Sequence, residues 1–192
     1  MLKYVAYITI CVVALLSACE PSGSESMEPA LINETITSSN QGPAVKEDNH
    51  TGNLDSNAME ALAVVNEWRQ KGCKCGDVSL PPTSKVTWNT KLYQAALAHA
   101  KDMHQNNYFS HTSPSGANVY NRLVESGYID DSRTILTYGE NIAFGDFDLQ
   151  AAVQKWLGSP SHCANLMRDS YKEMAIAHDG NYWVQVFGAT RN

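Results

Sequence analysis

Residues 139–142 read Gly-Glu-Asn-Ile and place a single carboxylate, Glu140, among small and amide side chains. Two other short polar segments carry histidine: residues 109–114 read Phe-Ser-His-Thr-Ser-Pro, and residues 159–165 read Ser-Pro-Ser-His-Cys-Ala-Asn. Two histidines and one carboxylate are an ordinary ligand set for zinc, which keeps water in its fourth position. The wide separation of the segments carries no local metal code of the H-E-x-x-H or CxxC type. On spacing alone, the competing interpretation is that His111 and His162 make capping hydrogen bonds in loops.

The sequence around these segments alternates between helical and extended patterns. Apolar residues three and four positions apart predict amphipathic helices, and short runs bounded by turn residues predict strands. Helices mixed with a small sheet predict a layered α+β domain. The patterns predict helices over 58–71, 90–106, 115–127 and 148–157, and extended segments over 86–88, 141–143, 171–177 and 182–187.

The composition excludes several classes of protein. The chain has 192 residues and a formal net charge of −6, and 43% of its residues are hydrophobic, as in an ordinary globular protein. It contains no cluster of Lys and Arg, so nucleic acid is not expected as the main partner. Its 5 cysteines are too few for a scaffold built from disulfides.

The first 19 residues are predicted to be a signal sequence. Lys3 precedes an uncharged apolar run over 4–16, which is too short to span a membrane. The run ends in Leu-Ser-Ala-Cys, which is typical of a bacterial lipoprotein signal in which Cys19 becomes the lipidated first residue. The alternative is an ordinary signal peptide that contains a cysteine. We expect a secreted protein anchored to a membrane of the cell envelope through lipid, in the outer membrane if the cell has one.

Residues 20–57 differ in composition from the rest of the chain. They lack aromatic residues and are rich in Ser, Asn, Glu, Thr and Gly, so they cannot bury enough apolar surface to form a core. We interpret them as a disordered tether between the lipid anchor and a folded domain over 58–192.

Several segments of this domain, in their order, resemble the CAP superfamily, also called the SCP/PR-1-like or allergen V5/Tpx-1-related domain. The likeness is closest to the bacterial secreted branch and covers nearly the whole domain. It implies an α-β-α sandwich with a small central antiparallel sheet flanked by helices. The segments are residues 65–69 (Val-Asn-Glu-Trp-Arg), 86–89 (Val-Thr-Trp-Asn), 97–100 (Leu-Ala-His-Ala), 108–114, 139–143, 156–165 and 183–187.

The resemblance also implies a site. It places His111, Glu140 and His162 in one central cavity that holds a divalent cation, for which zinc is the most plausible metal. The resemblance implies that many eukaryotic relatives carry a further His just before the last strand, where this chain has Tyr182, and that His162 replaces a second Glu. Three ligands plus water then remain, and Tyr182 is expected to hydrogen-bond that water.

The number of cysteines in the predicted domain allows one disulfide. Without Cys11 in the signal and Cys19 in the lipid anchor, Cys73, Cys75 and Cys163 remain, which suggests one disulfide and one leftover cysteine. The resemblance to bacterial CAP domains implies that the pair is Cys75 and Cys163.

Two classes of function follow from these features. The first is a non-enzymatic envelope domain that binds a ligand in the His-Glu-His cavity: a divalent metal, a lipid or a cell-wall component. The second is a metal-dependent or acid–base hydrolase of an envelope polymer or peptide, in which Glu140 assists the attack of water. Because a Glu140 that ligates zinc is less available as a base, the binding class is preferred. No G-x-S-x-G motif supports a serine hydrolase, and His99 is predicted to be a packed core residue.

Overall fold

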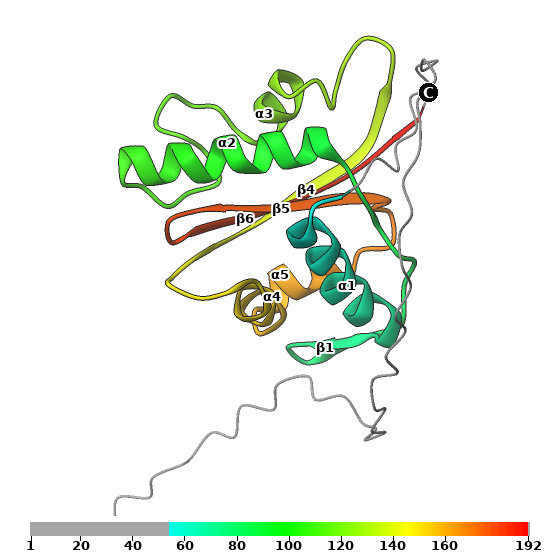
Figure 1. Cartoon of the computed structure of the whole chain (residues 1–192). Coiled ribbons are helices and arrows are strands. Elements are labelled where there is room, and N and C mark those ends of the chain that lie inside the picture. The colour runs from blue at the N-terminus through cyan, green and yellow to red at the C-terminus, as the bar shows by residue number, and fades with distance from the viewer. Residues whose placement is uncertain (1–53, 192) are drawn as a thin grey trace, which may run out of the picture.

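The computed structural model describes residues 54–191, and these form three layers (Figure 1). A central sheet lies between helices α2 and α3 on one face and helices α1, α4 and α5 on the other. The predicted α+β sandwich is therefore confirmed. The predictions for the signal peptide, for Cys19 and for most of the tether fall outside the described residues. Within 54–191, no helix has both the length and the apolar character that crossing a membrane requires.

The sheet has the strand order β3-β5-β6-β4. Strands β5, β6 and β4 pair antiparallel, as predicted, whereas the short β3 pairs parallel with β5. β6 is one of the two inner strands and is buried along most of its length, while β4 lies at an edge and is much longer than the predicted segment 141–143. The strands are β3 (Thr87–Trp88), β4 (Thr134–Phe144), β5 (Glu173–Asp179) and β6 (Tyr182–Arg191).

Helix α2 (Thr90–Asn106) follows the predicted apolar periodicity, and its buried face packs on β5 and β6. Helix α3 (Val119–Glu125) begins later than predicted. Ser113 folds the preceding segment into a turn by hydrogen-bonding Ala117, and Asn118 then caps the helix through a capping box with Asn121. Because the turn uses these backbone groups, the helix cannot start at residue 115.

The opposite layer contains α1 (Ser56–Lys71), α4 (Leu149–Leu157) and α5 (Pro160–Leu166). Asp55 and Asp148 cap the first two through side-chain hydrogen bonds to backbone N–H groups. Helix α5 forms from the polar segment 159–165, for which the sequence patterns predicted no helix. Pro160 occupies its first turn, where the missing N–H costs nothing, but the helix is too short to show periodicity in the sequence.

A small hairpin of β1 (Cys73–Cys75) and β2 (Val78–Leu80), which the sequence did not indicate, joins this layer. The predicted disulfide between Cys75 and Cys163 is present and ties β1 to α5. Cys73 is also buried, and its Sγ lies 3.7 Å from that of Cys163. The three sulfur atoms lie within 4.8 Å of one another and form a cluster that could hold a metal ion when the cysteines are reduced.

We predict that removing the disulfide with Cys75→Ser and Cys163→Ser lowers the free energy of unfolding by about 4 to 5 kcal/mol. The bond closes a sequence separation of 88 residues, so it restricts a large loop in the unfolded chain. Urea denaturation of the variant and of the wild-type protein, each with and without reductant, measures the effect. A loss below about 1 kcal/mol would contradict the loop-closure argument.

Candidate functional site

A cavity of about 410 Å³ opens at the edge strand β4. One wall is the segment between α2 and α3, and the other is α5, so the cavity spans the edge of the sheet between two layers. His111, Glu140 and His162 all line it, which places the three predicted residues in one cavity. Its other lining residues include Tyr138, Ser161, Asn165 and Arg168.

The glycine of the Gly-Glu-Asn-Ile segment is required by close packing. A Cβ atom at Gly139 would lie 2.0 Å from the hydroxyl of Tyr171 and 2.8 Å from the side-chain oxygen of Asn165. The absence of a side chain lets Tyr171 donate to Asn165 Oδ1 at 2.7 Å. Gly139 therefore allows the α5 layer to approach the strand that carries Glu140.

Asn141 connects the same strand to the His162 helix. Its side-chain amide donates to the backbone oxygen of His162 at 3.2 Å and to Gln185 Oε1 at 3.0 Å, and its oxygen accepts from Asn165 at 2.9 Å. Asn141 and Gln185 are fully buried, where an unpaired amide is costly. This network fixes α5, and with it His162, against β4.

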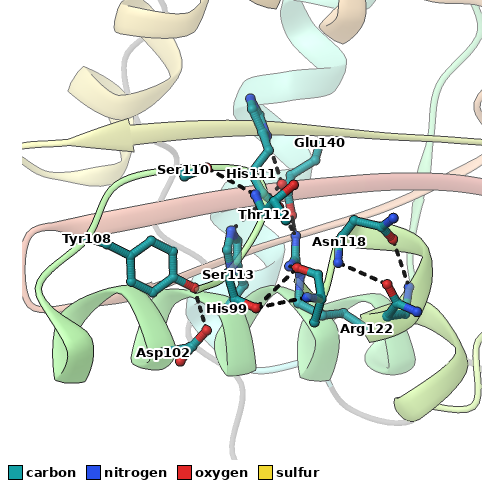
Figure 2. Close-up of polar contacts among 12 residues, drawn as sticks. His99, Asp102, Tyr108, Ser110, His111, Thr112, Ser113, Asn118, Arg122 and Glu140 are labelled. Carbon is teal, nitrogen blue, oxygen red and sulfur yellow. Dashed lines mark hydrogen bonds and ion pairs between the residues drawn. The ribbon is translucent and has the colours of Figure 1, made fainter. Parts of the chain in front are cut away.

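Glu140 points to the other side, toward α2 and α3 (Figure 2). Its side chain is only 2% exposed, yet both carboxylate oxygens have partners. Oε2 accepts from Arg122 at 2.8 Å, and Oε1 accepts from Nδ1 of His111 at 2.8 Å. A buried carboxylate is tolerated only when it is paired in this way.

Arg122 was not identified from the sequence. Its guanidinium donates to Glu140 and also to the backbone oxygens of His111 and Ala117, at 3.0 and 3.2 Å. It therefore holds the His111 segment to the sheet edge. It lies on α3, 18 positions from Glu140, and no motif links the two residues before the chain folds.

The two histidines differ in their environments. The His111 side chain is 54% exposed. Because a carboxylate only accepts hydrogen bonds, Nδ1 of His111 is the donor to Glu140, which leaves Nε2 available for a ligand. Burial, and then the proximity of His111, lower the pKa of His162. A lowered pKa favours the neutral imidazole, the form that binds metals.

Glu140 does not fit the role of a third metal ligand. Both its oxygens are in use, and the neighbouring guanidinium would repel a cation. In residues 54–191, the three cysteines are the only set of three metal-binding side chains whose donor atoms all lie within 4.8 Å of one another. His111 and Glu140 are in contact, but His162 does not complete such a set with them. The hydrogen bond to His111 gives Glu140 the role of an orienting carboxylate for a ligating histidine.

Tyr182 is not a neighbour of this cavity, which corrects the prediction. In the β4–β6 ladder Tyr182 pairs with Phe144, whereas Glu140 pairs with Val186. A separation of four residues along a strand is about 13 Å. The Tyr182 ring instead stacks on His104.

His99 is fully buried on α2, as predicted, and its Nε2 lies 3.9 Å from Oε1 of Glu140. Burial is the main cause of its lowered pKa, which Glu140 opposes and Arg122 reinforces. A neutral imidazole beside Glu140 leaves Arg122 as the buried cation that balances the carboxylate.

The family model of the CAP, or cysteine-rich secretory protein, family matches residues 62–187, more than half of the chain. The chain belongs to the CAP family. A solved structure similar to this CAP domain is an extracellular protein containing an SCP domain from Bacillus anthracis. The two share 26% identity and a TM-score of 0.58, over 77% of this chain and 45% of that one. An outer surface protein of Borrelia burgdorferi shares the fold, with 20% identity and a TM-score of 0.57, over 71% of this chain and 95% of that one.

Two proteins of Bacillus subtilis are similar in sequence. The membrane protein YlbC is 36% identical over 104 residues, which cover 54% of this chain and 29% of YlbC. YkwD is 29% identical over 98 residues, which cover 50% of this chain and 36% of YkwD. The chain thus spans about a third of the length of these relatives. The similarity is to the CAP domain, and neither name assigns that domain a ligand.

We predict that Arg122→Ala lowers the free energy of unfolding by about 3 to 5 kcal/mol, because Glu140 remains buried without its guanidinium partner. Lys71→Ala is the control, since Lys71 forms an exposed pair with Glu67 and its loss should cost about 0.3 to 0.5 kcal/mol. Urea denaturation at neutral pH compares the two. Equal losses in both variants would show that the buried ion pair does not stabilise the fold.

Proposed function

We propose that this CAP domain is a non-enzymatic binding domain of the cell envelope, and that its cavity holds a divalent cation between His111 and His162. The observation that carries the proposal is the hydrogen bond from Nδ1 of His111 to Glu140, which orients the ring and leaves Nε2 for a metal. Imidazole suits zinc, which is the most plausible cation. A bound zinc ion supplies a positive anchoring point for a further ligand.

A hydrolase is the second candidate, because a carboxylate hydrogen-bonded to an imidazole can also orient a general base. The geometry gives this candidate less support. Glu140 is buried with both oxygens engaged, so it is not available to activate water. Ser161 lines the cavity, but its hydroxyl pairs with that of Ser159 at 3.4 Å rather than with a histidine. Binding therefore accounts for more of the observed contacts than catalysis does.

We predict that zinc binds the protein near neutral pH, and that His111→Ala or His162→Ala removes the binding. Glu140→Gln should weaken it about 10- to 100-fold, because the orienting carboxylate is lost. His104→Ala is the matched control, since His104 is also exposed but pairs with Asp179 away from the cavity. Isothermal titration calorimetry gives affinity and stoichiometry for each variant. Equal binding by the wild-type protein and His111→Ala would overturn the site.

The pH dependence gives an independent check. Protons compete with the metal for imidazole nitrogen, so zinc affinity should fall as pH drops below about 6. Because its pKa is lowered, His162 stays neutral, and therefore able to bind zinc, to a lower pH than an ordinary histidine. Zinc binding that strengthens toward acid pH would contradict ligation by the two histidines.

The proposed location rests on the lipoprotein-type ending at Cys19 and on the extracellular and outer-surface relatives. We predict that Cys19→Ala blocks processing or releases the protein from membranes, because stable anchoring needs two lipid chains or more. Fractionation of cells that express each form measures this. Ser22→Ala is the control, because it changes a nearby residue and leaves the cysteine in place. If the Cys19→Ala protein still fractionates with membranes as before, the lipid anchor is wrong.

A further inference from the structure

Arg168 is a cation without a carboxylate partner in the candidate site. It is exposed and lines the cavity beside His162, with its guanidinium 5.7 Å from the centre of the Tyr171 ring. Within residues 54–191, no carboxylate forms an ion pair with it. The chain carries more acidic than basic side chains, so an arginine without an acidic partner in a cavity is a feature that a ligand can use.

The remaining charge of the cavity does not cancel this arginine. Glu140 is the one acidic residue among the described residues that line the cavity, and Arg122 neutralises it from the buried side at 2.8 Å. The charge that a ligand meets is therefore positive. A guanidinium binds carboxylates through charge-assisted hydrogen bonds, which are stronger than neutral ones. The cavity is thus complementary to an anionic group.

Two exposed tyrosines lie in contact at this cavity, one in its lining and the other beside that one. Tyr138 lines the cavity and is 39% exposed, and Tyr120 from α3 is 42% exposed. Their ring centres are 6.1 Å apart. Exposed tyrosine rings offer an apolar face together with a hydroxyl, which suits a ligand that has both apolar C–H faces and hydroxyl groups.

An extended peptide is disfavoured at this edge. A peptide would add to β4 through main-chain hydrogen bonds. However, the backbone oxygen of Tyr138 already accepts from the hydroxyl of Tyr171 at 3.3 Å, and that of Glu140 accepts from Asn165 at 3.2 Å. These side chains occupy the groups that a peptide strand would need beside the cavity.

We propose that the ligand of this cavity is an acidic glycan, whose carboxylate binds Arg168 and whose sugar rings stack on Tyr138 and Tyr120. The inference deepens the proposed function, because it rests on this cavity being the ligand site, but it does not require a bound cation. It assigns Arg168 to anion recognition and the two tyrosines to recognition of the sugar.

The test is calorimetric titration of the full-length protein with an oligosaccharide of galacturonic acid, first in the presence of EDTA and then with zinc. Arg168→Gln should weaken binding about tenfold, because one charge-assisted contact is lost. Tyr138→Ala should weaken it several-fold. Arg133→Gln is the control, since Arg133 is an arginine away from the cavity that pairs with Asp130. Thermal unfolding confirms that each variant is folded.

Three further ligands separate the possible sources of binding. The neutral galactose oligosaccharide should bind at least tenfold more weakly than the acidic one, and a short polyglutamate peptide and inorganic phosphate should bind weakly. Equal binding of the peptide and the acidic oligosaccharide would overturn the glycan assignment. Binding of the acidic oligosaccharide that Arg168→Gln leaves unchanged would overturn the role of Arg168.

The outcomes distinguish this inference from the cation proposal. If zinc binds in a His111-dependent manner and no oligosaccharide binds, the glycan inference fails and the cation proposal stands. If the acidic oligosaccharide binds in EDTA in an Arg168-dependent manner and zinc does not bind, the cation proposal fails and the glycan inference stands.

Discussion

The buried carboxylate of Glu140 is the constraint on which the site depends. A charge in this position is costly unless it is paired and hydrogen-bonded, and the pairing requires two further segments to converge on β4. Arg122 brings α3, and His111 brings the segment that precedes it. Because Arg122 also binds the backbone of His111 and Ala117, it fixes a stretch of irregular chain in which most residues are exposed.

The other wall of the cavity is held by neutral hydrogen bonds between β4 and α5 and by the disulfide between α5 and β1. Two independently fixed walls form a preorganised site, which reduces the ordering cost of binding. The same contacts favour binding over catalysis, because a general base must be free to accept a proton and both oxygens of Glu140 are occupied. The groups that remain available are those of the two proposals: Nε2 of His111 and the imidazole of His162 for a cation, and the guanidinium of Arg168 for an anion.

The sequence by itself determined the helices whose periodicity is long enough to detect. Helix α2 appeared at its predicted position because an amphipathic pattern over several turns needs no tertiary information. The β5–β6 hairpin was also visible, since Asp179-Gly180-Asn181 is a strong turn signal. The family resemblance supplied the sandwich, the Cys75–Cys163 pair and the grouping of His111, Glu140 and His162, which no local spacing encodes.

The tertiary structure alone decided the remaining features. Helix α5 and the β1–β2 hairpin are too short to show a period, so their existence depends on packing. The register of β4 on β6 separated Tyr182 from Glu140, because each step along a strand moves a side chain by about 3.3 Å. Arg122 became part of the site only when α3 folded over the sheet edge. A buried charge needs a partner near in space, and nearness in space between distant segments is set by the packed fold rather than by any local pattern of residues.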